Sequence, residues 1–446
     1  MFCQENSAHG ATVSSLLSCQ VQTSCFGTAG RPGTAAIGHH RGDPASNPTR
    51  QSGVMTSADL GSAPTDTTRS SMQATDPCVH CGFCLPTCAS YRVLGTEMDS
   101  PRGRIHALKA IEAGELQLDA TVAKHFDSCL GCLACVSACP SGVRYDQLIE
   151  ATRPKLNQPE LRSPAQRMFR KLLFSLLPYP RRLRAALTPL RAYAGSPLQV
   201  MARGSGLTRL FGPQLEAMER LLPPMPTGAF CDDVPKVVPA LGEQRARVGL
   251  VLGCVQRVFD PGVNQAAIEV LSANGIEVVI PESQGCCGAA THHQGELQQT
   301  RELAEALMAS FRNVGPLDAV LVAASGCGHT LKHYDSILEG NPSAGGFATS
   351  IVDIHEYLTG LGLSQAFRSR LAPLRHGDGQ PASEERPFEV AYHDACHMLH
   401  GQGIRDQPRQ LLRQIPHLRV KEAMDCLLYT SPSPRDRSVP RMPSSA

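Results

Sequence analysis

The sequence predicts a mixed fold, α/β plus α+β, in which a cysteine-rich N-terminal domain precedes a duplicated α/β domain whose second copy is truncated. Two observations support this prediction. Four cysteines lie within eleven residues at Cys78–Cys88, and four more lie within Cys129–Cys139. Further along the chain, short β-rich runs alternate with helical patterns, which indicates strand–helix–strand units and parallel sheets.

Length, charge and cysteine usage narrow the class of protein. The chain has 446 residues, 18 cysteines, no tryptophan and a formal net charge of +2. This balanced charge gives no reason to expect a nucleic-acid partner. No apolar run is long enough to span a membrane, and no secretory signal pattern begins the chain, so a cytoplasmic location is predicted. In a reducing compartment, clustered cysteines bind metal or carry out redox chemistry more often than they form disulfides.

Residues 1–72 are rich in Ser, Thr, Gly, Ala and Pro and have no sustained apolar periodicity. This composition predicts a disordered extension, or an upstream translation whose true start is Met55 or Met72. Both cysteine runs fall in the next block, and Pro101–Leu116 between them has a helical pattern. We therefore expect a compact cysteine-rich domain over residues 73–156.

Residues 157–245 are expected to form a basic helical linker. Between Leu161 and Leu215, ten Lys or Arg residues alternate with apolar residues and no acidic residue occurs. The helices are expected to break at Pro178, Pro180 and Pro189. Such a stretch can make a peripheral contact with the cytoplasmic face of a membrane or pack on a partner. The alternative is a solvated connector that wraps its own protein, and a proline-rich hinge at 223–226 follows.

The first α/β domain is expected over residues 246–360. Its predicted strands and helices alternate in the order Arg247–Cys254, Gly262–Gly275, Ile276–Glu282, Gly295–Phe311 and Asp318–Gly328. The first, third and fifth of these segments have strand character, and the others have helical periodicity. Alternation of this kind predicts a parallel sheet.

After a linker at 361–387, the pattern begins again. In the second copy, expected over 388–425, Phe388–Cys396 repeats a strand that ends in cysteine, and Gly403–Ala423 repeats the helix and second strand. Residues 426–446 are expected to be a non-native tail, because Cys426–Asp436 resembles the translation of an adaptor used in preparing sequencing libraries. A natural disordered tail is the alternative.

The spacing C-x2-C-x2-C-x3-C occurs twice, and this predicts two iron-sulfur clusters. In bacterial two-cluster ferredoxins, three cysteines of each run hold one cluster and the fourth binds the other. One 4Fe-4S cluster is thus expected on Cys78, Cys81, Cys84 and Cys139, and the other on Cys129, Cys132, Cys135 and Cys88. Structural zinc is the alternative, but it favours two separated ligand pairs around one ion. The 73–156 block is therefore predicted to be a two-cluster ferredoxin-like domain of the helical type.

Cysteines also follow the predicted strands of the α/β region. Carboxyl ends of parallel strands are where open α/β sheets build ligand sites, so these thiols are expected to converge. They are candidate ligands of a further iron-sulfur cluster: Cys254, Cys286, Cys287 and Cys327 in the first copy and Cys396 in the second. A redox role, or simple packing of buried thiols, is the alternative.

Histidines surround the last of these cysteines. His393, His397 and His400 are each interpreted as structural residues, with a ligand or proton-carrying role as the alternative. The sequence contains no phosphate-binding loop, serine elbow or HExxH motif, and no flavin or nicotinamide site of its own. No catalytic residue is therefore assigned.

These motifs resemble the iron-sulfur subunit of glycolate oxidase, also called glycolate dehydrogenase. The resemblance runs from Asp76 to Asp425 and includes CVHCGFC, PRGRI, SCLGCLAC, CPSGVRYDQLIE, GCVQ, CCGA, SGCG and YHDACHMLHGQGIR. A two-cluster ferredoxin domain followed by two cysteine-rich CCG domains also occurs in heterodisulfide reductase subunits, anaerobic glycerol-3-phosphate dehydrogenase and lactate-utilisation proteins. The HGQG stretch and the first cysteine run favour the glycolate family.

The resemblance implies an electron-transfer subunit that does not itself bind substrate. A separate FAD-binding flavoprotein subunit would oxidise glycolate to glyoxylate, and this chain would pass the electrons toward a quinone or another acceptor. A heterodisulfide-reductase-like, lactate-utilisation or glycerol-3-phosphate dehydrogenase subunit is the nearest alternative. A non-catalytic iron-sulfur scaffold is the alternative from a different class.

Two departures from the wider family concern the CCG domains. The motif that ends in CxxC elsewhere is Cys327-Gly-His-Thr330 here, so the first CCG domain lacks a fifth cysteine at that position. The spacing from Cys254 to Cys286, carried over to Cys396, predicts the second CCG motif near residue 428, where the adaptor-like text begins. We therefore expect the second CCG domain to be incomplete and unstable.

Overall fold

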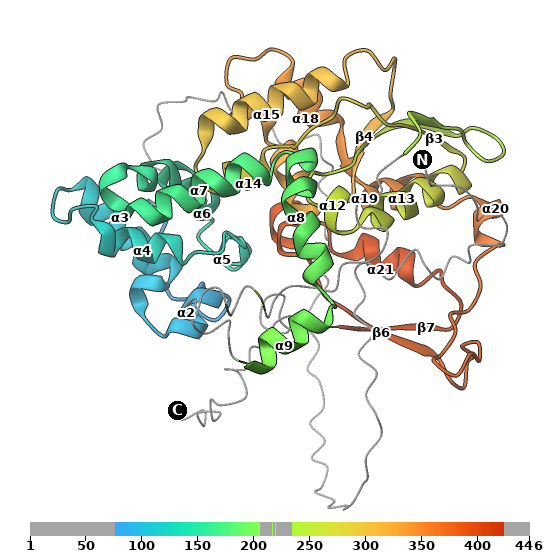
Figure 1. Ribbon diagram of the computed structural model, residues 1–446, viewed down its shortest axis with the longest axis horizontal. Coiled ribbons are helices and arrows are strands. Elements are labelled where there is room, and N and C mark those ends of the chain that lie inside the picture. The colour runs from blue at the N-terminus through green and yellow to red at the C-terminus, as the bar shows by residue number, and fades with distance from the viewer. Residues whose placement is uncertain (1–75, 206–215, 217–218, 220–233, 423–446) are drawn as a thin grey trace, which may run out of the picture.

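The computed structural model describes residues 76–205, 216, 219 and 234–422. The expected N-terminal extension, the proline-rich hinge at 223–226 and the expected tail at 426–446 lie outside these residues. Figure 1 shows a helical region in blue and cyan, a sheet region in yellow and orange, and green helices that run between the two. None of the helices in the described part of the chain is long and apolar enough to cross a membrane.

The N-terminal region consists of short helices around a small apolar core. Its helices are α2 (Ala89–Leu94), α3 (Pro101–Glu112), α4 (Ala120–Asp127), α5 (Ala134–Ser137) and α6 (Tyr145–Thr152), with the 3₁₀ turns η2 (Glu97–Asp99), η3 (Arg153–Asn157) and η4 (Pro159–Leu161). Phe126 of α4 and Leu148 of α6 are fully buried in this core, beside Ile105 of α3. Both cysteine runs lie in loops and short turns at the surface of this core, in agreement with the predicted helical, ferredoxin-like type.

Helix α3 begins where the sequence places it. Ser100 caps the helix by accepting a hydrogen bond from the Gly103 amide at 3.0 Å, and Pro101 occupies the first turn. Glycine is required at 103, because a Cβ atom there would lie 2.0 Å from the carbonyl oxygen of Glu97. The helix ends one turn before the predicted boundary at Leu116, so the prediction is confirmed except for that turn.

Three helices lead from the N-terminal region toward the sheet: α7 (Pro164–Leu176), α8 (Pro180–Tyr193) and α9 (Pro197–Ser205). Helix α8 begins at Pro180 as predicted, but it continues through Pro189, so the predicted break at Pro189 is wrong. Proline at this position removes one hydrogen bond, to the carbonyl of Ala185. Ala185 is exposed, so water can satisfy that carbonyl and the helix continues.

Helix α7 packs on the sheet region through one side only. Phe174 is buried, and Arg170 pairs with Glu296 of the sheet region at 2.9 Å. On the opposite side, Met168 and Leu172 are 72% and 56% exposed. The linker therefore packs on its own protein, as expected for a connector. It also has an exposed apolar face, which a membrane or partner contact would require.

A five-stranded sheet forms the core of the C-terminal half. Its strands are β1 (Val237–Val238), β2 (Ala246–Val251), β3 (Ile276–Val279), β4 (Ala319–Val322) and β5 (Ile351–Asp353), in the order β1-β3-β2-β4-β5. All neighbours pair in parallel except β1, which runs antiparallel to β3. The predicted parallel sheet is thus confirmed, although β1 lies in the stretch expected to be linker.

Helices cover both faces of this sheet (Figure 1). On one face, α13 (Pro261–Ala273) and α19 (Ile354–Leu361) pack against Val248, Leu250 and Val278. On the other face, α15 (Leu297–Ser310) and α18 (Ala344–Ser350) pack against Val320 and Val322. The strands are buried on both sides, which explains why they read as continuous apolar runs.

The predicted strand Asp318–Gly328 is wrong in its second half. Strand β4 ends at Val322, and α16 (Ser325–Leu331) follows. After Val322 the chain has only small residues up to Gly326, with no β-branched side chain to favour an extended strand. Cys327 therefore lies on a helix above the carboxyl end of the sheet.

A second, two-stranded parallel sheet contains β6 (Phe388–Tyr392) and β7 (Leu418–Glu422). Between them lie a short π-helix, η5 (His397–Gly401), and α21 (Asp406–Leu412). The strand–helix–strand order matches β2–α13–β3, as predicted for the beginning of the second copy. Helix η5 packs against α16 and also contacts α5, so this segment touches both the first sheet region and the helical region.

Candidate iron-sulfur sites

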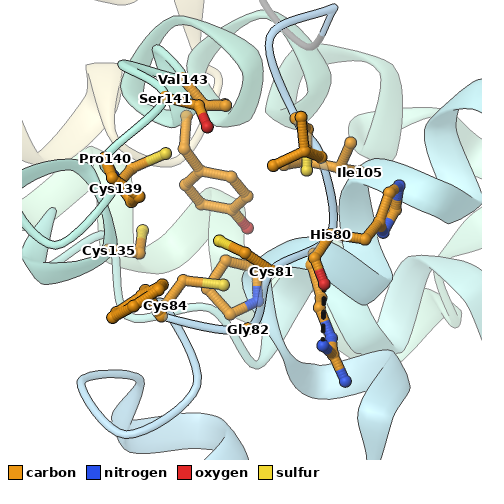
Figure 2. A pocket seen from close by; sticks show the side chains of 16 residues that line it. His80, Cys81, Gly82, Cys84, Ile105, Cys135, Cys139, Pro140, Ser141 and Val143 are labelled. Atoms are coloured by element: carbon orange, nitrogen blue, oxygen red, sulfur yellow. Dashed lines mark hydrogen bonds between the residues drawn. The ribbon is translucent and has the colours of Figure 1, made fainter.

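The first cysteine run lines a pocket together with the end of the second run. The wall of this open pocket contains Cys78, Cys81, Cys84, Cys135 and Cys139. Figure 2 shows the thiols of Cys81, Cys84, Cys135 and Cys139 turned toward the same space. All four cysteines predicted for the first cluster are therefore brought together. At the rim, Val79 and Phe83 are 70% and 64% exposed, so this pocket lies at the protein surface.

A second pocket lies next to the first. Its wall contains the four cysteines predicted for the other cluster, Cys88, Cys129, Cys132 and Cys135. Cys135 and Tyr145 belong to the walls of both pockets, so the two sites share one side. The Tyr145 hydroxyl donates a hydrogen bond to the Cys129 sulfur at 3.7 Å.

The backbone of the two runs is shaped alike. The second residue after the first cysteine has a positive φ in each run, 54° at His80 and 64° at Gly131. The fourth residue does so too, with 87° at Gly82 and 63° at Leu133. Left-handed backbone is unfavourable for His and Leu, by roughly 1–2 kcal/mol each. These conformations curl each loop so that its thiols point inward, and they recur at equivalent positions because both loops perform the same task.

The donor set fits iron-sulfur clusters better than single ions. In the described part of the chain, no three Cys, His, Asp or Glu side chains close around a point suited to one metal ion. Four thiols that surround a cube of iron and sulfur lie further apart than the ligands of one ion, and each pocket has at least four cysteines around open space. This arrangement disfavours the structural-zinc alternative.

Burial sets the protonation of these thiols in the free chain. The pKa of the Cys135 thiol is raised well above its ordinary value, first by burial and then by the neighbouring Cys129 and Cys132. Burial also raises the pKa of Cys84. Iron binds the thiolate form, so assembly of a cluster in either pocket must release protons.

The PRGR sequence at the start of α3 supplies one arginine to each pocket. Arg102 lines the first pocket, is partly exposed, and pairs with Glu97 at 2.6 Å. Arg104 lines the second pocket and is 1% exposed. Because Gly103 brings the helix start close to Glu97, the two arginines leave the chain toward different pockets.

Arg104 is held by a dense set of hydrogen bonds. It donates to the His125 carbonyl at 2.7 Å and to the hydroxyls of Ser90 and Ser128 at 3.0 and 2.8 Å. Its closest carboxylate is Asp99, at 3.7 Å, which is also buried. Burial opposes the charge of Arg104, but the neighbouring Tyr145 and the cluster cysteines outweigh it and raise its pKa. The second pocket therefore has a permanent buried cation in its wall.

The cysteines of the sheet region converge as predicted. The sulfur atoms of Cys254 and Cys286 lie 3.3 Å apart, and Cys287 interacts with Cys327. Cys254, Cys286 and Cys287 are buried in the apolar core above the carboxyl ends of β2 and β3. The contact with Cys286, together with burial, raises the pKa of Cys254 far above its ordinary value. Neighbouring thiols and burial also raise the pKa of Cys286 and Cys287, so these three thiols must lose their protons before they can bind iron.

Cys396 lies after strand β6, directly before η5, and is half-buried. The position of the missing fifth cysteine is occupied by Thr330 of α16, which is 1% exposed. Its hydroxyl is buried without a hydrogen-bond partner in the described part of the chain. The first CCG region thus presents four converging thiols and one unsatisfied hydroxyl.

Histidines gather where the helical region and the two sheets meet. The ring centroid of His397 lies 4.9 Å from that of His293 and 5.4 Å from that of His329. Burial, followed by the neighbouring His333, lowers the pKa of His329 to about 4. His397 is therefore one of a neutral, packed group, whereas His400 lies 2.9 Å from the Ser137 hydroxyl. Sequence reasoning missed His293 and His329, although both closely follow the CCG and SGCG motifs.

Arg153 connects the second pocket to the first sheet region. Its guanidinium donates to the Cys129 carbonyl at 2.8 Å and also to the His293 carbonyl. Gly295 packs so closely here that a Cβ atom would lie 2.6 Å from the Arg153 backbone. Sequence reasoning did not single out Arg153, because nothing in its local pattern marks it.

Three matches to known protein families cover the helical region, the linker and the two sheet regions. Residues 74–143 match the family described as 4Fe-4S dicluster domain. Residues 165–222 match the linker region of the glycolate oxidase iron-sulfur subunit. Residues 248–332 and 390–425 match the family described as cysteine-rich domain. No solved structure matches the chain.

Curated relatives cover most of the chain. A probable glycolate oxidase iron-sulfur subunit from Bacillus subtilis (strain 168) is 35% identical over 77% of this chain and 76% of its own length. The glycolate oxidase iron-sulfur subunit of Escherichia coli (strain K12) is 29% identical over 76% of this chain and 74% of its own length. Lactate utilization protein A of Geobacillus thermodenitrificans (strain NG80-2) is 26% identical over 39% of this chain and 67% of its own length.

The fold and its cysteine sites define a class of iron-sulfur protein in which a ferredoxin-like region is joined to CCG domains. Such proteins transfer electrons within oxidoreductases. Within this class, the chain belongs to the family of glycolate oxidase iron-sulfur subunits. It is accordingly an electron-transfer subunit of an oxidoreductase, and a partner subunit is implied.

Proposed function

We propose that this chain carries electrons from a flavoprotein subunit that holds FAD and oxidises glycolate to glyoxylate, toward a quinone or another acceptor. The observation that supports this most is the division of the eight predicted cysteines between two adjacent pockets, in a chain related over most of its length to glycolate oxidase iron-sulfur subunits. When bound, iron-sulfur clusters accept and release single electrons. The chain's own residues bind, bury and separate them.

The proposed ligands follow the two pockets. Cys78, Cys81, Cys84 and Cys139 hold one 4Fe-4S cluster, and Cys129, Cys132, Cys135 and Cys88 hold the other. Tyr145 fills the space beside both, and the curled backbone at His80 and Leu133 aims the thiols inward. The exposed rim at Val79 and Phe83 gives a partner access to the first pocket.

The proposed path continues into the CCG region. Arg153 joins the Cys129 carbonyl to the His293 carbonyl, and His293 follows the CCG motif. A further iron-sulfur cluster on Cys254, Cys286, Cys287 and Cys327, with Cys396 as an additional candidate, would extend the path. The buried, unsatisfied hydroxyl of Thr330 supports the presence of a bound group beside these thiols.

We propose the domain limits that the sequence indicates: an extension at 1–72, the ferredoxin-like domain at 73–156, a linker at 157–245, CCG domains at 246–360 and 388–425 joined by 361–387, and a tail at 426–446. The repeated order β2–α13–β3 and β6–α21–β7 supports duplication.

The proposal also includes the location of the chain in the cell. We propose a cytoplasmic chain that makes peripheral contact with a membrane through its basic linker. The exposed apolar residues Met168, Phe169 and Leu172 of α7, flanked by Arg167 and Lys171, support this contact.

The alternatives are weaker on specific grounds. The lactate-utilisation relative covers 39% of this chain, and the match to the glycolate oxidase linker at 165–222 favours the glycolate assignment. A scaffold without turnover would not need two cluster sites that share a wall.

The test is anaerobic purification of the chain, followed by iron and acid-labile sulfide analysis and low-temperature EPR. We expect about eight irons from the ferredoxin-like region and two interacting reduced-cluster signals. Cys81→Ala and Cys132→Ala should each remove one signal, whereas Cys254→Ala should leave both and reveal any additional iron. The flavoprotein subunit plus glycolate should reduce both clusters; zinc in place of iron, or no reduction, would contradict the proposal.

A further inference from the structure

The two cluster pockets differ most in the charges built into their walls. In the first pocket, the lining cation Arg102 is 29% exposed and is neutralised by Glu97 in a direct pair. In the second, Arg104 is buried, and its carboxylate partner Asp99 lies further away, at 3.7 Å. The same four-residue sequence, PRGR, thus gives one pocket a solvated neutral pair and the other a buried cation.

Arg153 is a second buried cation, and it lies just behind the wall of the second pocket. It is 8% exposed and donates to the carbonyl of Cys129, one of the lining cysteines. A Cβ atom on Gly131, between Cys129 and Cys132, would lie 3.4 Å from the same guanidinium. Two guanidinium groups against one buried carboxylate leave the second pocket with an excess of positive charge.

These charges act on a group that gains negative charge on reduction. A nearby cation stabilises the reduced form and raises the reduction potential, and net charge is one of the main factors that set cluster potentials. An exposed charge acts through water, with a dielectric constant near 80, whereas a buried one acts through an effective value near 20, an about fourfold stronger effect. Burial of the second site by itself disfavours the extra negative charge, and the arginines oppose this penalty.

We propose that Arg104, supported by Arg153, raises the reduction potential of the cluster in the second pocket and so draws electrons from the first pocket toward the CCG region. This inference rests on the two clusters proposed above. In the step, one electron leaves the first site, which is oxidised, and reaches the second, which is reduced, with no change in bonds. The arginines keep their protons and stay charged throughout.

The geometry gives the step a direction along the chain. The first pocket opens at the exposed residues Val79 and Phe83, where a partner can approach. The second pocket is linked through Arg153 to His293, in the loop after the CCG motif. Leu130 in the wall of the second pocket is also 62% exposed, so the link to His293, not depth, distinguishes the two sites. A higher potential at the second site favours movement from the first pocket toward the sheet region.

The experiment is an EPR-monitored redox titration of the full, cluster-loaded chain. Cys132→Ser, a change at a ligand of the second pocket, identifies the signal of that cluster. We expect Arg104→Gln to lower its potential enough to change its electron occupancy at least tenfold relative to the first cluster, which is about 59 mV for one electron. Arg153→Gln should shift it in the same direction. The matched control, Arg102→Gln, should leave the second cluster unchanged and shift the first by a smaller amount.

Asp99→Asn separates electrostatics from structural damage. It removes the carboxylate that partly neutralises Arg104 while keeping an oxygen that can accept hydrogen bonds, so the potential of the second cluster should rise. Arg104→Lys keeps the charge and should restore most of the potential lost in Arg104→Gln. If Arg104→Gln fails to assemble its cluster, the potentials measured in Asp99→Asn and Arg104→Lys still show whether the charge of Arg104 sets the potential of the second cluster.

Unchanged potentials in Arg104→Gln and Asp99→Asn, or shifts in the same direction, would overturn the inference. Iron content and the two EPR signals of the unmodified chain test the cluster assignment separately. A chain without two clusters refutes the proposed function, and the inference with it. A chain with both clusters and unresponsive potentials refutes the inference alone.

Discussion

The helical region and the first sheet region both concentrate cysteines, but they use them in different ways. In the helical region, the thiols surround open pockets at the surface of a small core. In the sheet region, Cys286 and Cys287 are each 1% exposed: Cys287 belongs to the apolar core on one face of the sheet, and Cys286 packs with Cys254 and Leu303. Cysteines thus line surface pockets beside a small core in one region and are packed inside the core in the other. The two regions should depend on iron to different degrees.

Iron removal should have the largest effect. Anaerobic chelation is expected to destabilise residues 76–156, because the loops that carry the cysteines surround open pockets and would lose the groups that close them. The five-stranded sheet should survive, since its core does not include the pockets. Limited proteolysis with mass spectrometry checks this: peptides from 76–156 should appear first. Equal protection of both regions after iron removal would show that the two regions do not differ in their dependence on iron.

A cavity in the sheet should produce the opposite pattern. Leu250 is fully buried in β2, so Leu250→Ala should lower the free energy of unfolding of the sheet region by about 2–5 kcal/mol. Iron bound in the helical region should be unchanged. Denaturant unfolding and iron analysis measure the two effects, and Leu241→Ala, at a residue 59% exposed, is the matched control. Loss of iron in Leu250→Ala would show that the regions do not fold independently.

The two sheets should also differ in stability. We expect protease to cut residues 388–422 before 237–353, because two strands bury far less apolar surface than five. Arg409 joins Asp394 and Glu422 at 2.7 and 2.5 Å and is nearly buried. Arg409→Ala should accelerate cutting several-fold, since it leaves Asp394 without its buried partner. Arg419→Ala, at an exposed pair with Glu389, should change the rate little. Equal cutting of both sheets would contradict the expected instability of the second copy.

The smallest effect concerns pH. A hydrogen bond from Arg409 lowers the pKa of Glu422 in the folded chain. The folded pKa lies below the unfolded one, so this pair stabilises the second sheet above the unfolded value of about 4.3 and loses that contribution as the pH falls through the folded pKa. Proteolysis of 388–422 should therefore accelerate modestly on acidification. In Glu422→Gln, this part of the pH dependence should disappear. An unchanged pH profile would show that Glu422 does not contribute to the pH dependence of proteolysis.

Cysteine spacing, capping residues and apolar runs in the sequence correctly predicted features that depend on nearby residues. The eight cysteines of the two runs were assigned to two groups from spacing alone, and each group lines its own pocket. Helix α3 and strands β2 and β3 followed from capping residues and apolar runs. The predictions at Pro189 and Gly328 failed because an exposed carbonyl tolerates proline and because small residues after β4 begin a helix.

What could not be predicted depends on segments far apart in the sequence. Arg153 and His293 meet only because Gly295 allows the loop after the CCG motif to pack against the helical region. His293, His329 and His397 come from three segments that join when η5 packs against α16. The different surroundings of Arg102 and Arg104 likewise follow from the direction in which α3 begins, not from the PRGR letters.

Cys135 stands in the wall of both pockets, and this shared wall has a consequence for stoichiometry. A reduced flavin holds two electrons, whereas each iron-sulfur site takes one at a time. Two such sites with a common wall can together hold two electrons, close to the surface where a donor can dock. In the complex proposed above, both electrons of one reduced flavin would then pass to the chain, one to each site, and no half-oxidised flavin would accumulate.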